Sequence, residues 1–174
     1  KIVATLPINV LLPLILTFLL YVFGAPPAPF GPLYIVSLLM MFTATAMGHI
    51  VSIISPPSMA QMVGVVLILI SITFSGSKPT VADFKKLHPA FLQYIPAISP
   101  IRWAFEANYL WNINPYRESI FPVLKDSIDY AMKVMLGFEP DDLPVCVGIL
   151  AGFAFSLHVV SFLTLLLAHR KKRI

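Results

Sequence analysis

The chain has 174 residues, of which 58% are hydrophobic and 11% are charged, and its formal net charge is +4. A soluble domain carries about 25% charged residues, so this chain lacks the charged surface that a water-soluble protein of its size needs. Its mean hydropathy of +0.86 and its long apolar runs place it among membrane proteins. No acidic residue, lysine or arginine occurs between Ile2 and Ser77.

The positive charge is concentrated at the C-terminal end, where Arg170-Lys171-Lys172-Arg173 directly follows an apolar run. Such a cluster is typical of a membrane-flanking anchor on the cytoplasmic side. A nucleic-acid-binding arm is the alternative, but we expect no nucleic-acid partner. The single cysteine, Cys146, excludes an internal disulfide and is interpreted as a plain helix-end residue. Because the chain begins at Lys1 without a signal peptide, we expect it to be part of a longer polypeptide.

The first apolar run, 2–23, reaches the ~20 residues that a membrane-spanning helix needs. Pro7 and Pro13 interrupt this run, and each frees a carbonyl four residues earlier because proline has no N–H. The carbonyl freed by Pro13 belongs to Asn9, which is itself polar. Two interpretations stay open: a kinked packing helix, or a helix on which Asn9 contacts a substrate.

A proline-rich turn, 24–32, leads to a second predicted span, 33–54, and the Ser55–Ser58 turn leads to a third, 59–74. In the second span Ala44, Gly48 and Ser52 recur every four residues, which predicts a ridge that lets another helix approach closely. His49 lies off this ridge. It is either a structural residue or a proton- or metal-binding one, and no second ligand-type residue lies at metal spacing.

The third span carries apolar residues on one face at helical spacing: Met62, Val65, Leu69, Ile72 and Thr73. Contact with lipid and an apolar substrate cavity both explain such a face.

The segment 75–144 holds all eight acidic residues of the chain together with seven basic ones. Its charges are embedded among aromatic and apolar residues, so we expect an external or re-entrant segment that dips to bilayer level against other protein. Thr80-Val81-Ala82-Asp83 predicts a helix start with a capping box, and Pro89 is expected to end that helix. Ser99-Pro100 predicts a second start. A further helix is expected from Val123 to Leu136, with Gly137 as its stop.

Within this segment Arg102 and Glu106 lie four residues apart, the only acid–base pair at helical spacing in an apolar stretch. The base precedes the acid, which is the weaker order for an exposed pair. Two interpretations stay open: the two side chains neutralise each other in a buried pair, or each bonds a different helix and fixes the re-entrant segment.

The last predicted span, 145–168, follows Asp141-Asp142, which favours a helix N-terminus. Gly148, Gly152 and Ser156 form a second small-residue ridge, and His158, off that ridge, is interpreted as structural. The expected fold class is an all-α membrane protein, a polytopic helical bundle with a re-entrant or external helical segment before the last span. Counting spans back from the basic tail places both ends of the chain in the cytoplasm and the segment 75–144 outside.

The sequence contains no phosphate-binding loop, no metal-ligand cluster and no nucleophile motif. Catalytic residues and metal ligands are therefore predicted to be none.

One run of motifs resembles a known family. Phe74-Ser75-Gly76, an insertion, Ser99-Pro100-Ile101-Arg102-Trp103-Ala104-Phe105-Glu106-Ala107 and a last span with a basic end resemble the transmembrane domain of ATP-binding cassette transporters of the G (white/brown complex) subfamily, which are ABC-2 type exporters. The resemblance covers essentially the whole chain, 1–174, as the C-terminal four of six spans. It implies a nucleotide-binding domain upstream that holds ATP and Mg²⁺, and no cofactor in this segment.

The resemblance also implies a homodimer or heterodimer with a second half-transporter and a central cavity that alternates between inward and outward access. The third span would line that cavity through Met62, Val65, Leu69, Ile72 and Thr73. The gate and re-entrant structure would rest on residues shared with the family motif, namely Gly76, Pro100, Arg102, Trp103 and Glu106. Two departures from the family are Ser77-Lys78, where some members carry bulky apolar residues, and an external segment without cysteines.

Three hypotheses follow from the sequence. The first is the membrane part of an ATP-driven exporter of lipid-like or hydrophobic cargo, in the plasma membrane or an internal membrane. The second is a membrane scaffold or assembly subunit that transports nothing. The third is an intramembrane enzyme that uses His49 or His158.

Overall fold

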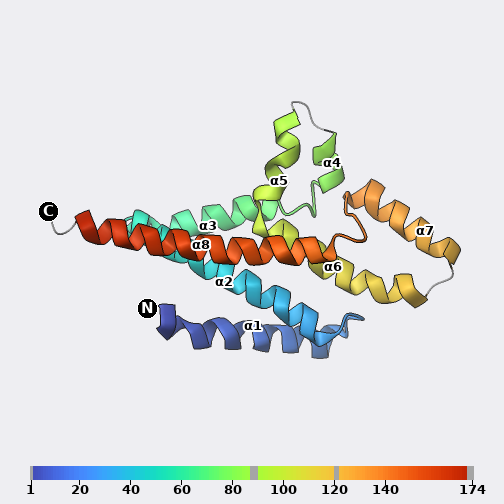
Figure 1. Cartoon of the computed structure of the whole chain (residues 1–174), viewed down its shortest axis with the longest axis horizontal. Helices are drawn as coiled ribbons and strands as arrows, with labels where there is room; N and C mark the ends of the chain where they lie inside the picture. Colours follow the sequence, from blue (N-terminus) through green and yellow to red (C-terminus); the bar gives the residue numbers. More distant parts are fainter. Residues whose placement is uncertain (1, 87–89, 120–121, 172–174) are drawn as a thin grey trace.

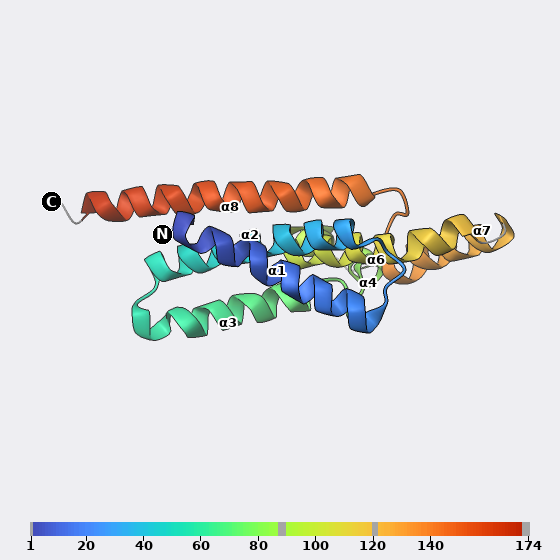
Figure 2. The same cartoon turned by 90° about the horizontal axis from the view of Figure 1, so that it is seen from below.

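The computed structural model describes residues 2–86, 90–119 and 122–171. This part of the chain is helical and contains no strand (Figure 1), so the predicted all-α class is confirmed. Four long helices form the bundle: α1 (Ile2–Gly24), α2 (Phe30–Ile54), α3 (Pro57–Thr73) and α8 (Leu143–Lys171). They run along one axis with successive helices reversed in direction. The start of α1 and the end of α8 therefore lie at the same end of the bundle (Figures 1 and 2).

Each long helix lies where an apolar run predicts one, but three of them begin earlier than expected. Helix α8 begins at Leu143 rather than Val145. Helix α2 begins at Phe30 rather than Leu33, and α3 begins at Pro57 rather than Met59. The reason is that proline is tolerated in the first turn of a helix, where the backbone N–H groups have no intrahelical partner. Pro32 and Pro57 thus lie inside their helices, and the turns before them are shorter than predicted.

Three helical segments in the described residues have the length and apolar composition to cross a membrane: Leu6–Gly24, Phe30–Ile54 and Leu143–Ala168. Helix α3 has 17 residues, which corresponds to about 25 Å of rise. This length is at the lower limit for a membrane-spanning helix, so the crossing of α3 stays a prediction.

Shorter helices fill the segment between α3 and α8: α4 (Val81–Lys85), the 3₁₀ turn η1 (Ala90–Tyr94), α5 (Ile95–Ile98), α6 (Pro100–Ser119), α7 (Pro122–Ala131) and the π-helical turn η2 (Met132–Leu136). Helices α4 and α5 project sideways from the bundle, whereas α6 and α7 form a hairpin that extends beyond the start of α8 (Figure 1). The α6–α7 hairpin thus lies at the end of the molecule opposite to the two chain ends (Figure 1).

The local signals in this segment act as predicted. Thr80 and Asp83 form a capping box at the start of α4, with both reciprocal hydrogen bonds present. The helical stretch from Pro122 ends at Gly137, whose φ of +78° is left-handed. Helix α4 ends at Lys85, and Pro89, which was expected to end it, lies outside the described residues.

The core of the bundle is built around α6, the least apolar of the longer helices. Ala104 and Ala107 of α6 are buried with Val36 of α2 and with Cys146 and Leu150 of α8. Cys146, predicted as a plain helix-end residue, lies in the first turn of α8 but is fully buried in this core. Helix α6 therefore packs inside the bundle at the level of the first halves of α2 and α8, and its re-entrant placement in the membrane stays a prediction.

The two small-residue ridges do not mediate close packing within this chain. A Cβ atom added at Gly48, Gly148 or Gly152 would meet nothing within 4 Å. Helix α8 packs instead through another face, which includes Leu150 and Ala154. The expectation failed because a helix in lipid is apolar on all sides, so its sequence does not mark the face that contacts protein.

Asn9 occupies a packing position. Its side chain is buried, and its Oδ1 accepts a hydrogen bond of 3.1 Å from Thr45 Oγ1 on α2. The contact connects α1 to α2 and matches the interpretation of a kinked packing helix.

Candidate functional site

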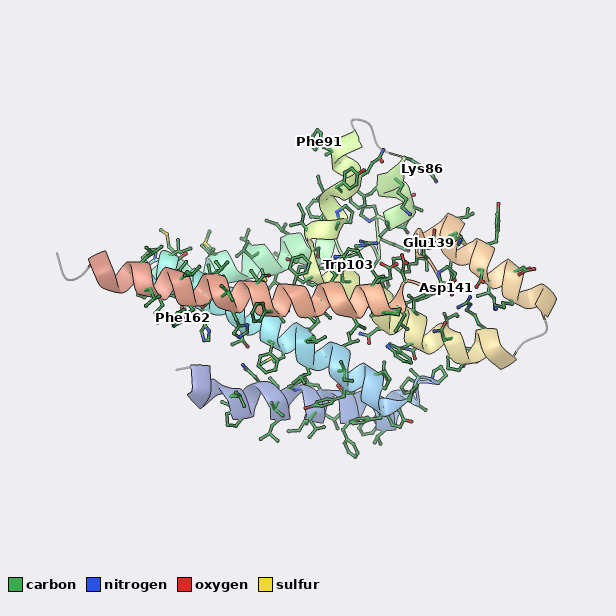
Figure 3. The ribbon with its side chains drawn as sticks, viewed as in Figure 1. Lys86, Phe91, Trp103, Glu139, Asp141 and Phe162 are labelled. Atoms are coloured by element: carbon green, nitrogen blue, oxygen red, sulfur yellow. The ribbon has the colours of Figure 1, made fainter. Side chains whose placement is uncertain are left out.

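The motif residues gather where α3 ends and α6 begins. We call this region the α3–α6 junction and define it by Ser71, Ser75, Gly76, Ser99, Pro100, Arg102, Trp103 and Glu106. Trp103 lies near the centre of the molecule, beside α8 and below α5 (Figure 3). The junction therefore connects the apolar bundle to the polar segment.

A side-chain hydrogen bond connects the two helices directly. Ser99 Oγ donates to the carbonyl oxygen of Ser71 in the last turn of α3, at 2.8 Å. Ser99 and Pro100 are both buried, and α6 begins at Pro100 as the sequence predicts. The last carbonyls of a helix lack intrahelical hydrogen-bond donors. The Ser99 hydroxyl donates to one of these carbonyls, and this bond holds the start of α6 against α3.

The turn after α3 requires glycine. Gly76 is buried and has a φ of +82°, and a Cβ atom placed there would lie 2.7 Å from Val81 Cγ2. Both the left-handed backbone and the close approach exclude a side chain. Ser77 and Lys78, where some relatives of the resembled family carry bulky apolar residues, are exposed.

Arg102 and Glu106 form an ion pair at 3.0 Å, with side-chain exposures of 12% and 2%. The Arg102 guanidinium carbon also lies 3.9 Å from the centre of the Trp103 ring, and Trp103 Nε1 donates to the carbonyl oxygen of Ala97 at 2.9 Å. The interpretation of a buried pair within one helix therefore holds.

A second polar cluster, not predicted from the sequence, joins α6, α7 and the turn before α8. Arg117 pairs with Asp129 at 2.7 Å and lies 3.9 Å from Asp141, and Lys133 pairs with Glu139 at 2.8 Å. Glu139 and Asp141 lie together beside the start of α8 (Figure 3). The sequence shows these charges but not their partners, because the pairs depend on how the α6–α7 hairpin folds back.

A close backbone contact attaches this cluster to α4. A Cβ atom at Gly137 would lie 2.6 Å from the backbone nitrogen of Ala82, and Lys85 Nζ donates to the Gly137 carbonyl at 3.1 Å. Next to it Phe138 is fully buried and packs its ring against Phe105 and Tyr109 of α6, with centroids 5.9 and 5.8 Å away. The polar segment is thus one packed unit built on α6.

The predicted substrate-facing residues of α3 all lie on its exposed side: Met62, Val65, Leu69, Ile72 and Thr73. No residue of α3 is fully buried. The opposite side of the helix, with Gly64, Leu67 and Ser71, borders a cavity of about 130 Å³ between α2, α3 and the start of α6. The assignment of the five residues to a substrate cavity stays a prediction.

The two histidines differ in their surroundings. His158 Nδ1 lies 2.8 Å from the Ala154 carbonyl, and its ring packs edge-on against Phe42. His49 is half-buried on α2. Among the described residues no group of three histidine, cysteine, aspartate or glutamate side chains could hold a metal ion, so no observation favours the intramembrane enzyme.

Comparison with known proteins identifies the family. The ABC-2 type transporter family matches residues 1–112, which run from α1 through most of α6. No curated protein and no solved structure matches the chain. The matched region covers well over half of the chain and includes the whole α3–α6 junction. The chain therefore belongs to the ABC-2 type transporter family and is the transmembrane part of an ABC transporter, a domain that is not itself catalytic.

Proposed function

We propose that the chain is the transmembrane part of an ATP-driven exporter of lipid-like or hydrophobic substrates, of the G subfamily. It would supply the C-terminal four of six spans and pair with a second half-transporter. ATP and Mg²⁺ would bind to a nucleotide-binding domain upstream. The subfamily assignment rests on the resemblance of Pro100-x-Arg102-Trp103-x-x-Glu106-Ala107, a pattern whose residues lie at the α3–α6 junction except for Ala107, which is part of the buried core.

The observation that carries this proposal is the exposure of α3. Met62 is 71% exposed, Leu69 57% and Ile72 50%, whereas α2 and α8 both contribute to the buried core. A helix that is apolar all round yet packs so little within its own chain has a face available to a partner chain or to cargo. Uncharged cargo with a large apolar surface suits such a face.

The α3–α6 junction suggests how this face is coupled to the gate. The Ser99–Ser71 hydrogen bond and the buried Gly76 turn connect α3 rigidly to α6. A movement of α3 would therefore shift α6, and the polar segment that is packed on α6 would follow. Alternating access requires a coupling of this kind between cavity and exit.

The orientation is part of the proposal. The start of α1 and the end of α8 lie at one end of the bundle (Figure 1), and the basic residues from Arg170 onward follow the last span. We infer that this end is cytoplasmic, with the segment 75–144 on the other side. Labelling of Lys85 or Arg117 from the cytosol in intact cells would contradict this orientation.

The test is transport by the full-length protein in vesicles that contain a fluorescent hydrophobic drug or lipid. We expect ATP-dependent movement, reduced several-fold by Leu69→Ser or Ile72→Ser. The matched control is Ile15→Ser on α1, which is 53% exposed but not predicted to line the cavity. All rates are normalised to the amount of monodisperse protein.

Transport that persists without nucleotide would contradict the exporter. Equal loss of transport in Leu69→Ser and Ile15→Ser would contradict the role of the α3 face. The scaffold alternative predicts that substitutions at Leu69 and Ile72 leave the activity of any partner unchanged.

A further inference from the structure

A second cavity, of about 470 Å³, lies in the polar segment between α4, the η1–α5 stretch and the start of α6. Two cationic side chains line it, Lys85 of α4 and Arg102 of α6, and Gln93 and Tyr94 of η1 supply further polar groups. No acidic residue and no residue of α3 is among the described residues around it. Its volume falls in the range of about 300–1,000 Å³ that is typical of small-molecule sites.

The two cations at this cavity are not matched by two carboxylates. Arg102 pairs with Glu106 at 3.0 Å, but Lys85 has no ion pair with any residue that the structure describes. The Lys85 Nζ donates instead to the neutral carbonyl oxygen of Gly137, at 3.1 Å. Two cations and one carboxylate leave a net charge of +1 beside the cavity, which one singly charged anion would neutralise.

The start of α6 adds to this positive potential. The helix begins at Pro100 and has 20 residues, and Arg102 lies in its first turn. The first backbone N–H groups of a helix have no intrahelical partner, and the helix dipole favours negative charge there. A cation such as Arg102 is thus at the less favourable end of its helix, and a bound anion would be stabilised by the side chain and by the dipole together.

These features define the chemistry of an occupant. Lysine and arginine side chains donate hydrogen bonds and accept none, so the polar end of the ligand must accept them. The rest of the wall is apolar and comprises Val81, Pro96 and Ala97, which an inorganic ion would leave uncovered. We propose that the cavity binds an organic anion whose carboxylate lies between Lys85 and Arg102 and whose apolar part packs against this wall.

The test uses full-length protein in phosphatidylcholine vesicles and a fatty acid that carries a photoreactive diazirine on its chain. After illumination, mass spectrometry of peptides locates the label. We expect saturable labelling within residues 81–102 that oleate displaces, whereas oleyl alcohol, which has the same chain without the charge, displaces it at least about tenfold less well.

A second competitor identifies the source of the anion. Hexanoate carries the same carboxylate but remains in the water. Displacement by hexanoate would support a ligand that arrives from the aqueous phase, and displacement by oleate alone would support one that arrives from the bilayer.

Lys85→Gln removes one of the two cations, and we expect a loss of affinity of about three- to tenfold, because solvent screens an exposed lysine. Lys86→Gln is the matched control, since Lys86 is exposed, carries the same charge and does not line the cavity. Lys85→Arg keeps the charge and should retain most of the affinity. Ala97→Phe fills the cavity without changing any charge and should abolish the saturable labelling, with folding checked by gel filtration.

Three results would overturn the proposal: labelling that does not saturate, equal displacement by oleate and oleyl alcohol, or equal affinity of the Lys85→Gln and Lys86→Gln variants. Retained labelling in a monodisperse Ala97→Phe variant would also place the anion elsewhere. The measurement needs no ATP and no residue of α3, so it can succeed where the transport assay fails, and the converse.

Discussion

Helices α3 and α6 meet at one junction but are opposite in composition and environment. Helix α3 carries no charge and has no buried residue, whereas α6 carries Arg102, Glu106 and Arg117 and contributes Ala107 and Leu110 to the fully buried set. In a water-soluble protein the apolar helix would be inside. The inversion indicates that the bundle is built for lipid, where polar groups must find protein partners and apolar ones need none.

The comparison also separates two kinds of residue. On α6 the charged side chains of Arg102, Glu106 and Arg117 have partners that fix their positions, so substitutions there are expected to act on folding. On α3 the exposed side chains make few contacts within the chain. Substitutions there are therefore expected to affect binding of the cargo or partner chain that contacts this face, rather than folding. The following predictions test this division, from the largest expected effect to the smallest.

Removing Arg102 should be the most damaging single change. Arg102→Leu leaves the buried Glu106 carboxylate without its ion-pair partner, which costs about 3–5 kcal/mol in comparable buried pairs. The double variant Arg102→Leu/Glu106→Leu should recover most of that loss, since no unpaired charge remains. Thermal unfolding of the full-length protein in detergent measures both effects.

An exposed pair provides the control for this prediction. Lys133 and Glu139 lie 2.8 Å apart but are 52% and 48% exposed, so Lys133→Gln should change the unfolding temperature little. If the double variant on α6 unfolds at the same low temperature as Arg102→Leu alone, the loss does not come from an unpaired Glu106 charge. That result would contradict the proposed difference between α6 and α3.

Glycine substitutions test the junction at smaller magnitude. Gly76→Ala places a side chain on a left-handed residue and 2.7 Å from Val81 Cγ2, which should destabilise by about 1–3 kcal/mol. Gly64→Ala on α3, where an added Cβ meets nothing within 4 Å, should be neutral or slightly stabilising. The same unfolding assay compares them, and equal stability of the two variants would show that the turn does not fix the junction.

The sequence predicts where the helices of this molecule begin and end better than it predicts how the helices pack against one another. Apolar runs bounded by proline place all four long helices, Thr80 and Asp83 place α4, and Gly137 places the end of the α7–η2 stretch, because these signals act within a few residues. The motif at Arg102 and Glu106 marks the region that the structure shows as the junction. Its local spacing also predicts that the two side chains can pair.

The sequence does not predict which face of each helix packs against the other helices. Gly148 and Gly152 look like a packing ridge, yet they are exposed, and Leu150 between them is fully buried. A helix that is apolar on every side gives no periodic signal to distinguish lipid from protein.

The smallest predicted effect concerns the capping box, at the exposed edge of the polar segment. Thr80 Oγ1 and the Thr80 backbone N–H donate to Asp83 Oδ2 at 2.7 and 3.0 Å, and these bonds lower the pKa of Asp83 below its ordinary value of 3.8. The carboxylate therefore stabilises α4 at pH values above its unfolded pKa, and this contribution is lost as the pH falls through the folded pKa. A carboxyl-carbon NMR titration should show the low pKa in the full-length protein and its return toward 3.8 in Thr80→Ala. Helix α4 contacts Gly137 through Lys85 and Ala82, so acid should loosen this contact while the buried contacts of α6 persist. A titration in which α4 and α6 unfold at the same pH would show that the exposed edge and the buried helix do not differ in this way.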